Sequence, residues 1–264
     1  MSSTAIHVSE LTHDFGGLRA VDNISFTINE GELVGLIGPN GCGKSTTFNC
    51  ISGLLDPTSG EIEIMGKSTN NLRPDQINNL GITRTFQHTR LWKEMTVIEN
   101  ILVPPNNQLS SNPILSLLRP NSRKEEAERI ERAYQVLESL EIAHVADNLA
   151  GKLSGGQSKL VDIARALMGS PKILLLDEPV AGVASVLAEK IFQNLRTLVN
   201  ETGISILVIE HNMDFILRLG VDRIIVMDSG RILMEGTSDE VRSNKSVIDA
   251  YLGSSIKHIL WKRY

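Results

Sequence analysis

A short glycine-rich stretch constrains this chain more than any other feature. The apolar run Leu33–Ile37 is followed by a glycine-rich loop and then by residues 46–52, which have the composition of a helix. An apolar run of this length suits a buried strand, so the order is strand, loop, helix. In that context the glycines let backbone N–H groups close around phosphate oxygens, and the helix adds the positive end of its dipole. The stretch is therefore predicted to be a nucleotide-binding P-loop.

Two side chains of this loop have separate predicted tasks. Lys44 supplies a positive charge for the β- and γ-phosphates, and Ser45 offers a hydroxyl to Mg²⁺. The predicted phosphate-binding residues are Gly38, Pro39, Asn40, Gly41, Cys42, Gly43, Lys44, Ser45 and Thr46.

Composition limits the classes of protein that remain. With 264 residues, 41% of them hydrophobic and 22% charged, the chain fits one elaborated domain or two small ones. The formal charge of −5 gives no support for general nucleic-acid binding, which favours a basic domain. No apolar run approaches the ~18 residues of a membrane span, and the N-terminus lacks the basic start and apolar core of a signal peptide. We expect the chain to stay inside the cell.

Both cysteines lie in or just after the P-loop. Cys42 and Cys50 are eight positions apart along a predicted helix, too far apart for an unstrained disulfide. Reduced thiols suit a cytoplasmic protein. Cys42 also sits at a helix N-terminus, an environment that can lower the pKa of a thiol.

The N-terminal third predicts an antiparallel β lobe. Residues 6–32 contain short apolar runs around Gly16-Gly17, a pattern of short strands and turns, and residues 61–64 alternate in the same way. Phe15, beside the glycine pair, could stack on an adenine ring. A core aromatic beside a turn explains Phe15 equally well.

The middle of the chain predicts a strand, an irregular segment and a helix. Residues 81–87 look like a strand that ends on Gln87, which from spacing alone is a surface amide. Residues 106–121 have no clear period and are predicted to be an irregular insertion. Residues 123–142 predict an amphipathic helix, whose buried stripe would contain Ala127, Ile130, Tyr134, Leu137 and Leu140.

Three further segments place polar groups at the ends of predicted elements. Leu153-Ser154-Gly155-Gly156-Gln157 precedes a predicted helix and could receive phosphate, although an isolated pentapeptide is a weak signal. The apolar run 173–176 ends in Asp177 and Glu178, which should point in different directions. Asp177 would then reach Mg²⁺, and Glu178 would face an attacking water. The buried run 204–209 ends in Glu210-His211, where a lone histidine is more often a capping residue than a catalytic one.

Together, these motifs resemble those of ABC-type ATPases. The P-loop, Gln87, the signature 153–157, Asp177-Glu178 and His211 occur in the order of that family, over residues 5–253. Within the family the chain is most similar to the ATP-binding subunits of branched-chain amino acid importers. The segments that carry this closer similarity are 15–21, 81–87, 95–100, 235–237 and 247–253.

The resemblance implies a fold and a set of roles. The fold would be α/β, with a mainly parallel core sheet, an N-terminal antiparallel β lobe and a helical subdomain at about 88–168. Phe15 would stack on adenine, Gln87 would sense Mg²⁺, nucleotide and the membrane partner, Glu178 would be the general base, and His211 would contact the γ-phosphate. Gln87 would thus join Ser45 and Asp177 as a metal-site residue.

It also implies partners. Two ATPase subunits would pair head to tail, so that Ser154, Gly155, Gly156 and Gln157 of one close on the ATP and Mg²⁺ held by the other. The pair would lie on the inner face of the cell membrane, against transmembrane permease subunits that receive substrate from an external binding protein. No nucleic acid is implied.

Two segments depart from the family pattern. Ala184 stands where the family usually has Asp or Asn, which puts communication between the two ATP sites in doubt. Residues 254–264 form a tail beyond the resemblance, with basic and aromatic residues suited to a membrane surface or a neighbouring subunit.

Three other functions share parts of this pattern. The chain could be the ATPase of a lipopolysaccharide exporter, although the insertion at 106–121 argues against that more compact cassette. It could serve a urea or amide importer of the same architecture. A soluble ABC protein that acts on ribosomes or DNA would usually carry tandem cassettes or long coiled-coil insertions, and this sequence has neither.

Overall fold

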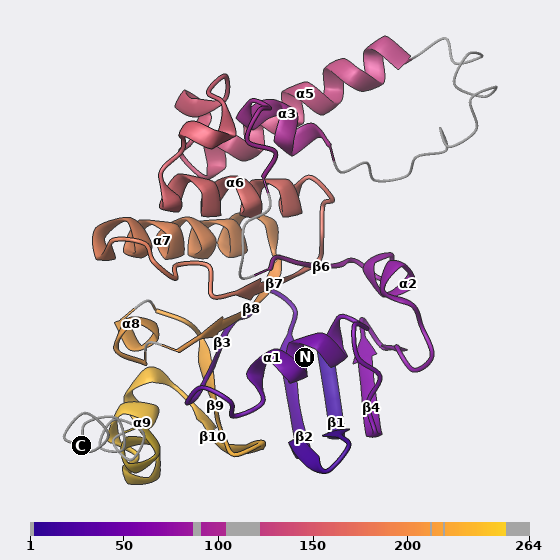
Figure 1. The fold of residues 1–264 in the computed structure, drawn as a ribbon, viewed down its shortest axis with the longest axis vertical. Helices are drawn as coiled ribbons and strands as arrows, with labels where there is room; N and C mark the ends of the chain where they lie inside the picture. The colour runs from indigo at the N-terminus through magenta and orange to yellow at the C-terminus, as the bar shows by residue number, and fades with distance from the viewer. Residues whose placement is uncertain (1–2, 87–90, 104–121, 212, 219, 252–264) are drawn as a thin grey trace. The chain divides into compact units, whose positions relative to one another are not determined.

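The computed structural model describes residues 3–86, 91–103, 122–211, 213–218 and 220–251 (Figure 1). The chain divides into two compact units. Unit 1 comprises Met1–Phe86, Lys172–Pro179 and Leu195–Tyr264, and unit 2 comprises Gln87–Pro171 and Val180–Asn194. No helix in the described part of the chain is long and apolar enough to span a membrane.

Unit 1 contains the predicted antiparallel lobe. Its strands are β1 (Thr4–Phe15), β2 (Leu18–Asn29), β4 (Ser59–Ile64) and β5 (Lys67–Ser68), in the order β2-β1-β4-β5. The prediction of several short strands over 6–32 is wrong, because β1 and β2 are each 12 residues long. Bulges explain the error. Register shifts and positive φ values at Glu10 (49°) and Asn23 (53°) break the apolar alternation without ending the strands.

The second sheet of unit 1 has six strands among the described residues. It is mainly parallel, as predicted. They are β3 (Leu33–Ile37), β6 (Ile82–Arg84), β7 (Ile173–Asp177), β8 (Ser205–Glu210), β9 (Arg223–Asp228) and β10 (Arg231–Gly236). Their order is β10-β9-β3-β8-β7-β6, and only the β9–β10 pair is antiparallel among these strands. Every residue of β3, β7 and β8 is buried, as continuous apolar runs in a parallel sheet require.

The strand predicted over residues 81–87 is shorter than expected. β6 ends at Arg84, although the Thr85 amide still donates to the Leu175 carbonyl at 2.9 Å. Gln87 lies outside the described residues, as does the predicted insertion at 106–121.

Short helices complete unit 1. They are α1 (Lys44–Ile51), α2 (Pro74–Asn78), α8 (Met213–Arg218) and α9 (Ser238–Ser243). α1 follows β3 directly through the P-loop and buries Phe48 and Ile51 in the core. The strand, loop and helix predicted from the sequence are therefore confirmed.

Unit 2 is helical. It contains α3 (Val97–Leu102), α5 (Ser122–Ser139), the short 3₁₀ helices η2 (Ala143–Val145) and η3 (Ala150–Lys152), α6 (Gly155–Leu167) and the first half of α7 (Ser185–Thr202). Backbone hydrogen bonds join its segments, including Val97 N–H to the Asn148 carbonyl and Ala150 N–H to the Met95 carbonyl, both at 2.9 Å.

The predicted helix at 123–142 forms, but its buried face was predicted only in part. Leu137 and Leu140 are buried, as expected, and Ala133 and Val136 join them. Ala127, Ile130 and Tyr134 are exposed. Among the described residues, only the C-terminal half of the helix packs against neighbouring elements, and the predicted stripe also included positions of the other half that these residues do not cover.

Candidate functional site

Glycine is required at two points of the P-loop. Gly38 and Gly43 have φ values of 155° and 104°. A Cβ at Gly38 would lie 2.1 Å from the Met227 carbonyl oxygen, and one at Gly43 would lie 2.5 Å from the Ala20 carbonyl oxygen. The loop is thus held between β9 and β2, with no space for larger residues at these contacts.

The lysine of the loop is buried within it. Lys44 is 6% exposed, and its Nζ donates to the carbonyl oxygens of Gly38 and Pro39 at 2.8 and 2.9 Å. Nζ also lies 3.7 Å from Cys42 Sγ. The loop carbonyls therefore hold the ammonium group inside the loop, where a phosphate can take their place.

The outer side of the loop and the start of α1 are accessible. Asn40, Gly41 and Ser45 are exposed, and Thr46 is half-buried. Gly43 caps α1 without a side-chain hydrogen bond, and the first turn has no acidic residue. This helix N-terminus can therefore offer its N–H groups to an anion.

The two cysteines are buried free thiols, and one expectation about them is wrong. Cys42 and Cys50 are 3% and 2% exposed. Burial raises the pKa of Cys42, although the nearby Lys44 ammonium opposes the shift, and burial raises the pKa of Cys50 to about 11. The expectation of a lowered pKa at Cys42 is therefore wrong, because the loss of hydration on burial is the largest effect on this thiol.

A tyrosine from the end of the chain also reaches the P-loop. Burial raises the pKa of the Tyr251 hydroxyl, which lies close enough to Cys42 and to the Gly38 backbone for both groups to affect that pKa. Nothing in the local sequence around Tyr251 signals this contact, since it joins residues more than two hundred positions apart.

The two adjacent carboxylates have different partners, as strand alternation predicts. Asp177 accepts from Arg84, with Nη2 and Oδ2 2.9 Å apart. Glu178 Oε1 lies 3.4 Å from His211 Nδ1, and the Glu178 amide donates to the Ile209 carbonyl. Glu178 has a φ of 49°, a left-handed conformation that non-glycine residues rarely adopt outside turns and functional sites.

Sheet order brings several of these groups to one edge. β8 lies between β3 and β7, and the three strands are parallel. The P-loop follows β3, Asp177 ends β7, and His211 follows β8. The carboxyl ends of adjacent parallel strands share one edge, the usual place for ligands in α/β sheets. Arg84 was not predicted as a site residue; the available signal was a basic residue within the predicted strand at 81–87.

Phe15 is accessible at the end of β1. Its ring is 48% exposed and meets the His13 ring edge-on, with centroids 4.5 Å apart. The ring is not part of the core, so the core alternative is wrong, and one face remains available for stacking.

The signature segment begins α6 in unit 2. Ser154 caps the helix: its Oγ accepts from the Gln157 amide at 3.3 Å, and Gln157 Oε1 accepts from the Ser154 amide at 3.0 Å. A Cβ at Gly156 would lie 2.2 Å from Leu187 Cδ2, whereas one at Gly155 would have no atom within 4 Å. Gly156 thus serves packing, and Gly155 leaves the surface open.

Ala184 is exposed at the start of α7. Its carbonyl accepts from the Ala188 amide at 2.9 Å, so its backbone completes the first turn of the helix.

Comparisons with known proteins agree with this arrangement. Residues 21–181 match the family described as ABC transporter, and residues 231–256 match the family described as branched-chain amino acid ATP-binding cassette transporter. The high-affinity branched-chain amino acid transport ATP-binding protein LivG of Salmonella typhimurium is 41% identical over 256 residues, which cover 97% of this chain and all of that protein.

Solved structures give the same result. The ADP conformation of MJ1267, an ATP-binding cassette of an ABC transporter, is 38% identical with a TM-score of 0.82, covering 95% of this chain and 99% of that one. The dimeric structure of the ATP-binding cassette MJ0796 bound to ADP and phosphate is 31% identical with a TM-score of 0.72, covering 88% and 98%. On these matches, the chain belongs to the ABC transporter family as an ATP-binding subunit.

Proposed function

We propose that this chain hydrolyses ATP to drive an importer of branched-chain amino acids. The observation that carries the substrate class is the match of residues 231–256 to the branched-chain amino acid cassette family. The similarity to LivG, a branched-chain amino acid transport ATP-binding protein, extends over 97% of this chain and supports the same substrate class.

The loop residues Gly38 to Thr46 would hold the phosphates of ATP. The Lys44 ammonium would exchange the carbonyls of Gly38 and Pro39 for phosphate oxygens, a stronger charge-assisted contact. Phe15 would stack on the adenine with its exposed ring.

Magnesium fits the residues at this edge of the sheet. Asp177 and Ser45 offer a carboxylate and a hydroxyl, and Mg²⁺ prefers such oxygen ligands. Within the described residues, no group of three or more His, Cys, Asp or Glu side chains could hold a metal. Mg²⁺ needs only a few protein ligands when phosphates and water complete its coordination. When bound, Mg²⁺ would neutralise charge on the phosphates; Gln87 is a further candidate ligand.

Glu178 would act as general base. Its position beside His211 gives the two side chains complementary tasks, with Glu178 receiving the proton of the attacking water and His211 contacting the γ-phosphate. Gln87 would complete this set of catalytic residues.

The functional unit would be a head-to-tail pair. Ser154, Gly155, Gly156 and Gln157 of one subunit would meet the nucleotide held by the other, and the open space at Gly155 and the dimeric cassette of MJ0796 support this. ATP would favour the closed pair through its differential affinity. The pair would act on the inner face of the membrane with permease subunits and an external binding protein.

Reconstitution tests the whole proposal. Permease and binding-protein genes next to this gene would supply the partners, and ATP inside vesicles should drive accumulation of labelled leucine. Uptake of urea or an amide instead would redirect the substrate class. Absence of any ATP-driven uptake by the assembled complex, with hydrolysis intact, would contradict the importer.

A further inference from the structure

We propose that Arg84 is a positioning residue that holds the Asp177 carboxylate in place for Mg²⁺. The inference rests on the proposed metal role of Asp177. It concerns a residue at the end of β6 that never touches the nucleotide in this scheme.

The ion pair is buried and direct. Arg84 Nη2 lies 2.9 Å from Asp177 Oδ2, and the two side chains are 9% and 10% exposed. The bond engages one oxygen of the carboxylate and thereby fixes the orientation of the group. Ligating carboxylates in metal sites are commonly held by such outer partners.

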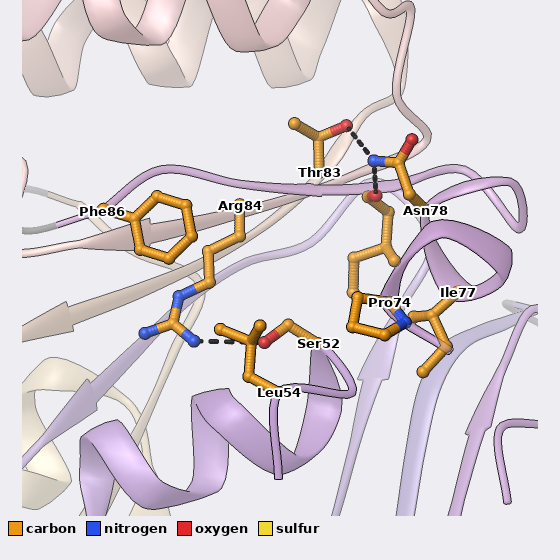
Figure 2. A pocket seen from close by; sticks show the side chains of 9 residues that line it. Ser52, Leu54, Pro74, Ile77, Asn78, Thr83, Arg84 and Phe86 are labelled. Atoms are coloured by element: carbon orange, nitrogen blue, oxygen red, sulfur yellow. Dashed lines mark hydrogen bonds between the residues drawn. The ribbon is translucent and has the colours of Figure 1, made fainter. Parts of the chain in front are cut away.

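The guanidinium is itself fixed by the P-loop helix. Nη1 donates to Asn49 Oδ1 at 2.7 Å, near the C-terminal end of α1. It also donates to Ser52 Oγ at 3.1 Å, at the C-cap of the same helix (Figure 2). Arg84 therefore links the helix that begins at Lys44 to the strand that ends at Asp177. A planar group with several donors can make this link, whereas an ammonium group cannot reach all three acceptors.

Two aromatic rings lie near the guanidinium. Its central carbon lies 5.5 Å from the Phe48 ring centroid and 5.4 Å from the Phe86 ring centroid. These distances are in the range of cation–π contacts. Phe86 and Arg84 line one cavity of about 180 Å³ (Figure 2).

Stability alone does not account for the arrangement. Arg84 Nε is buried and has no hydrogen-bond partner among the described residues. A buried N–H without a partner is unfavourable, and a buried ion pair is often no more stabilising than apolar side chains of the same volume. A requirement to orient Asp177 explains why a charged side chain stands here.

Metal affinity tests the inference separately from turnover. Binding of Mn²⁺ in the presence of ADP is measured by electron paramagnetic resonance, and binding of a fluorescent ADP analogue is measured in EDTA. Arg84→Met should weaken Mn²⁺ binding by ~10- to 100-fold, the usual effect of losing an outer partner. Metal-free ADP affinity should stay close to that of the parent protein. The Mn²⁺ affinity of Arg84→Lys should lie between those of Arg84→Met and the parent protein, because lysine keeps the charge without the planar fork.

Two controls isolate the effect. Arg73→Met removes an exposed arginine that pairs with Asp75, at 72% and 61% exposure, and should leave Mn²⁺ binding unchanged. If Arg84→Met does not fold, Asn49→Ala removes one acceptor of the guanidinium and should weaken Mn²⁺ binding less strongly.

The outcomes distinguish this inference from the function on which it rests. Mn²⁺ binding by Arg84→Met that equals or exceeds that of the parent protein would overturn it, as would an equal loss of metal-free ADP affinity. Unchanged Mn²⁺ binding in Asn49→Ala would do the same where Arg84→Met fails to fold. If Asp177→Asn also leaves Mn²⁺ binding unchanged, the metal role of Asp177 is wrong as well.

Discussion

Glu178 combines an unusual backbone with a central side chain. Its φ of 49° turns the chain sharply after β7, while its carboxylate meets His211. Such a conformation costs of the order of 1 to 3 kcal/mol, and it persists only where the surrounding structure enforces it. The Glu178 amide, bonded to the Ile209 carbonyl at 3.0 Å, is one such constraint.

We expect Glu178→Gln to separate binding from hydrolysis. The substitution keeps size and hydrogen bonding but removes the base, so turnover should fall by at least ~10²-fold while nucleotide affinity is retained. Phosphate release and equilibrium binding measure the two properties, with the exposed Glu189→Gln as the matched control. Near-normal turnover in the variant would remove Glu178 from the role of base.

Both thiols should react slowly in the folded protein. Alkylation requires the thiolate, and burial raises the pKa values of Cys42 and Cys50 above the usual 9.0. Reaction with iodoacetamide at neutral pH should therefore be much slower than in the unfolded chain, and should accelerate as pH rises above 9. Mass spectrometry of quenched samples measures the rates. Fast labelling of native Cys42 at neutral pH would show that the loop opens in solution.

At the scale of elements, α6 begins with two adjacent glycines that have different surroundings. Gly156 packs under Leu187 and Val183, whereas Gly155 faces open space. The same tight contact joins α6 to the beginning of α7 within unit 2.

Gly156→Ala should destabilise the protein by ~1 to 3 kcal/mol, the usual cost of an extra methyl group in a packed contact. Gly155→Ala is the matched control and should leave the free energy of unfolding nearly unchanged. Urea titration followed by circular dichroism compares the two. Equal stability of the variants would mean that Leu187 moves aside without cost.

Elements and their order were predictable where the signal was local. The P-loop strand and helix, the buried run ending in Asp177 and the capped helix at Ser154 all follow from short patterns of residues. The roles of Arg84 and Tyr251 do not follow from local patterns, because they depend on partners more than ninety positions away in the sequence. The stripe on α5 failed for a related reason: periodicity shows which positions share a helix face, and not how far a neighbouring element extends along it.

At the scale of the whole molecule, the C-terminal tail and the segment that precedes it differ in their expected importance. Deleting residues 256–264, which lie outside the described structure, should leave the basal ATPase activity of the isolated subunit unchanged. Any effect should appear only in the assembled transporter, as weaker association with membrane subunits or lipid. Loss of basal hydrolysis in this truncation would show that the tail packs on the catalytic unit.

A deletion that also removes Tyr251 should behave differently. The Tyr251 side chain lies close to Gly38 and Cys42 of the P-loop, so its loss should weaken nucleotide affinity. Tyr251→Ala and Tyr251→Phe, compared by titration with a fluorescent ATP analogue, separate loss of the ring from loss of the hydroxyl. Unchanged affinity in Tyr251→Ala would mean that the loop keeps its shape without this contact.

The P-loop is supported by Gly230, in the turn directly before the region that matches the branched-chain amino acid cassette family. Gly230 donates its amide to the Cys42 carbonyl at 3.1 Å, and its own carbonyl accepts from the Asp22 amide at 2.8 Å. The matched C-terminal region begins at the next residue, 231, and extends past Tyr251. Exchanging residues 231–256 with those of a related subunit would therefore alter the strand that begins directly after this support of the P-loop, so ATP affinity should be measured in any such chimaera.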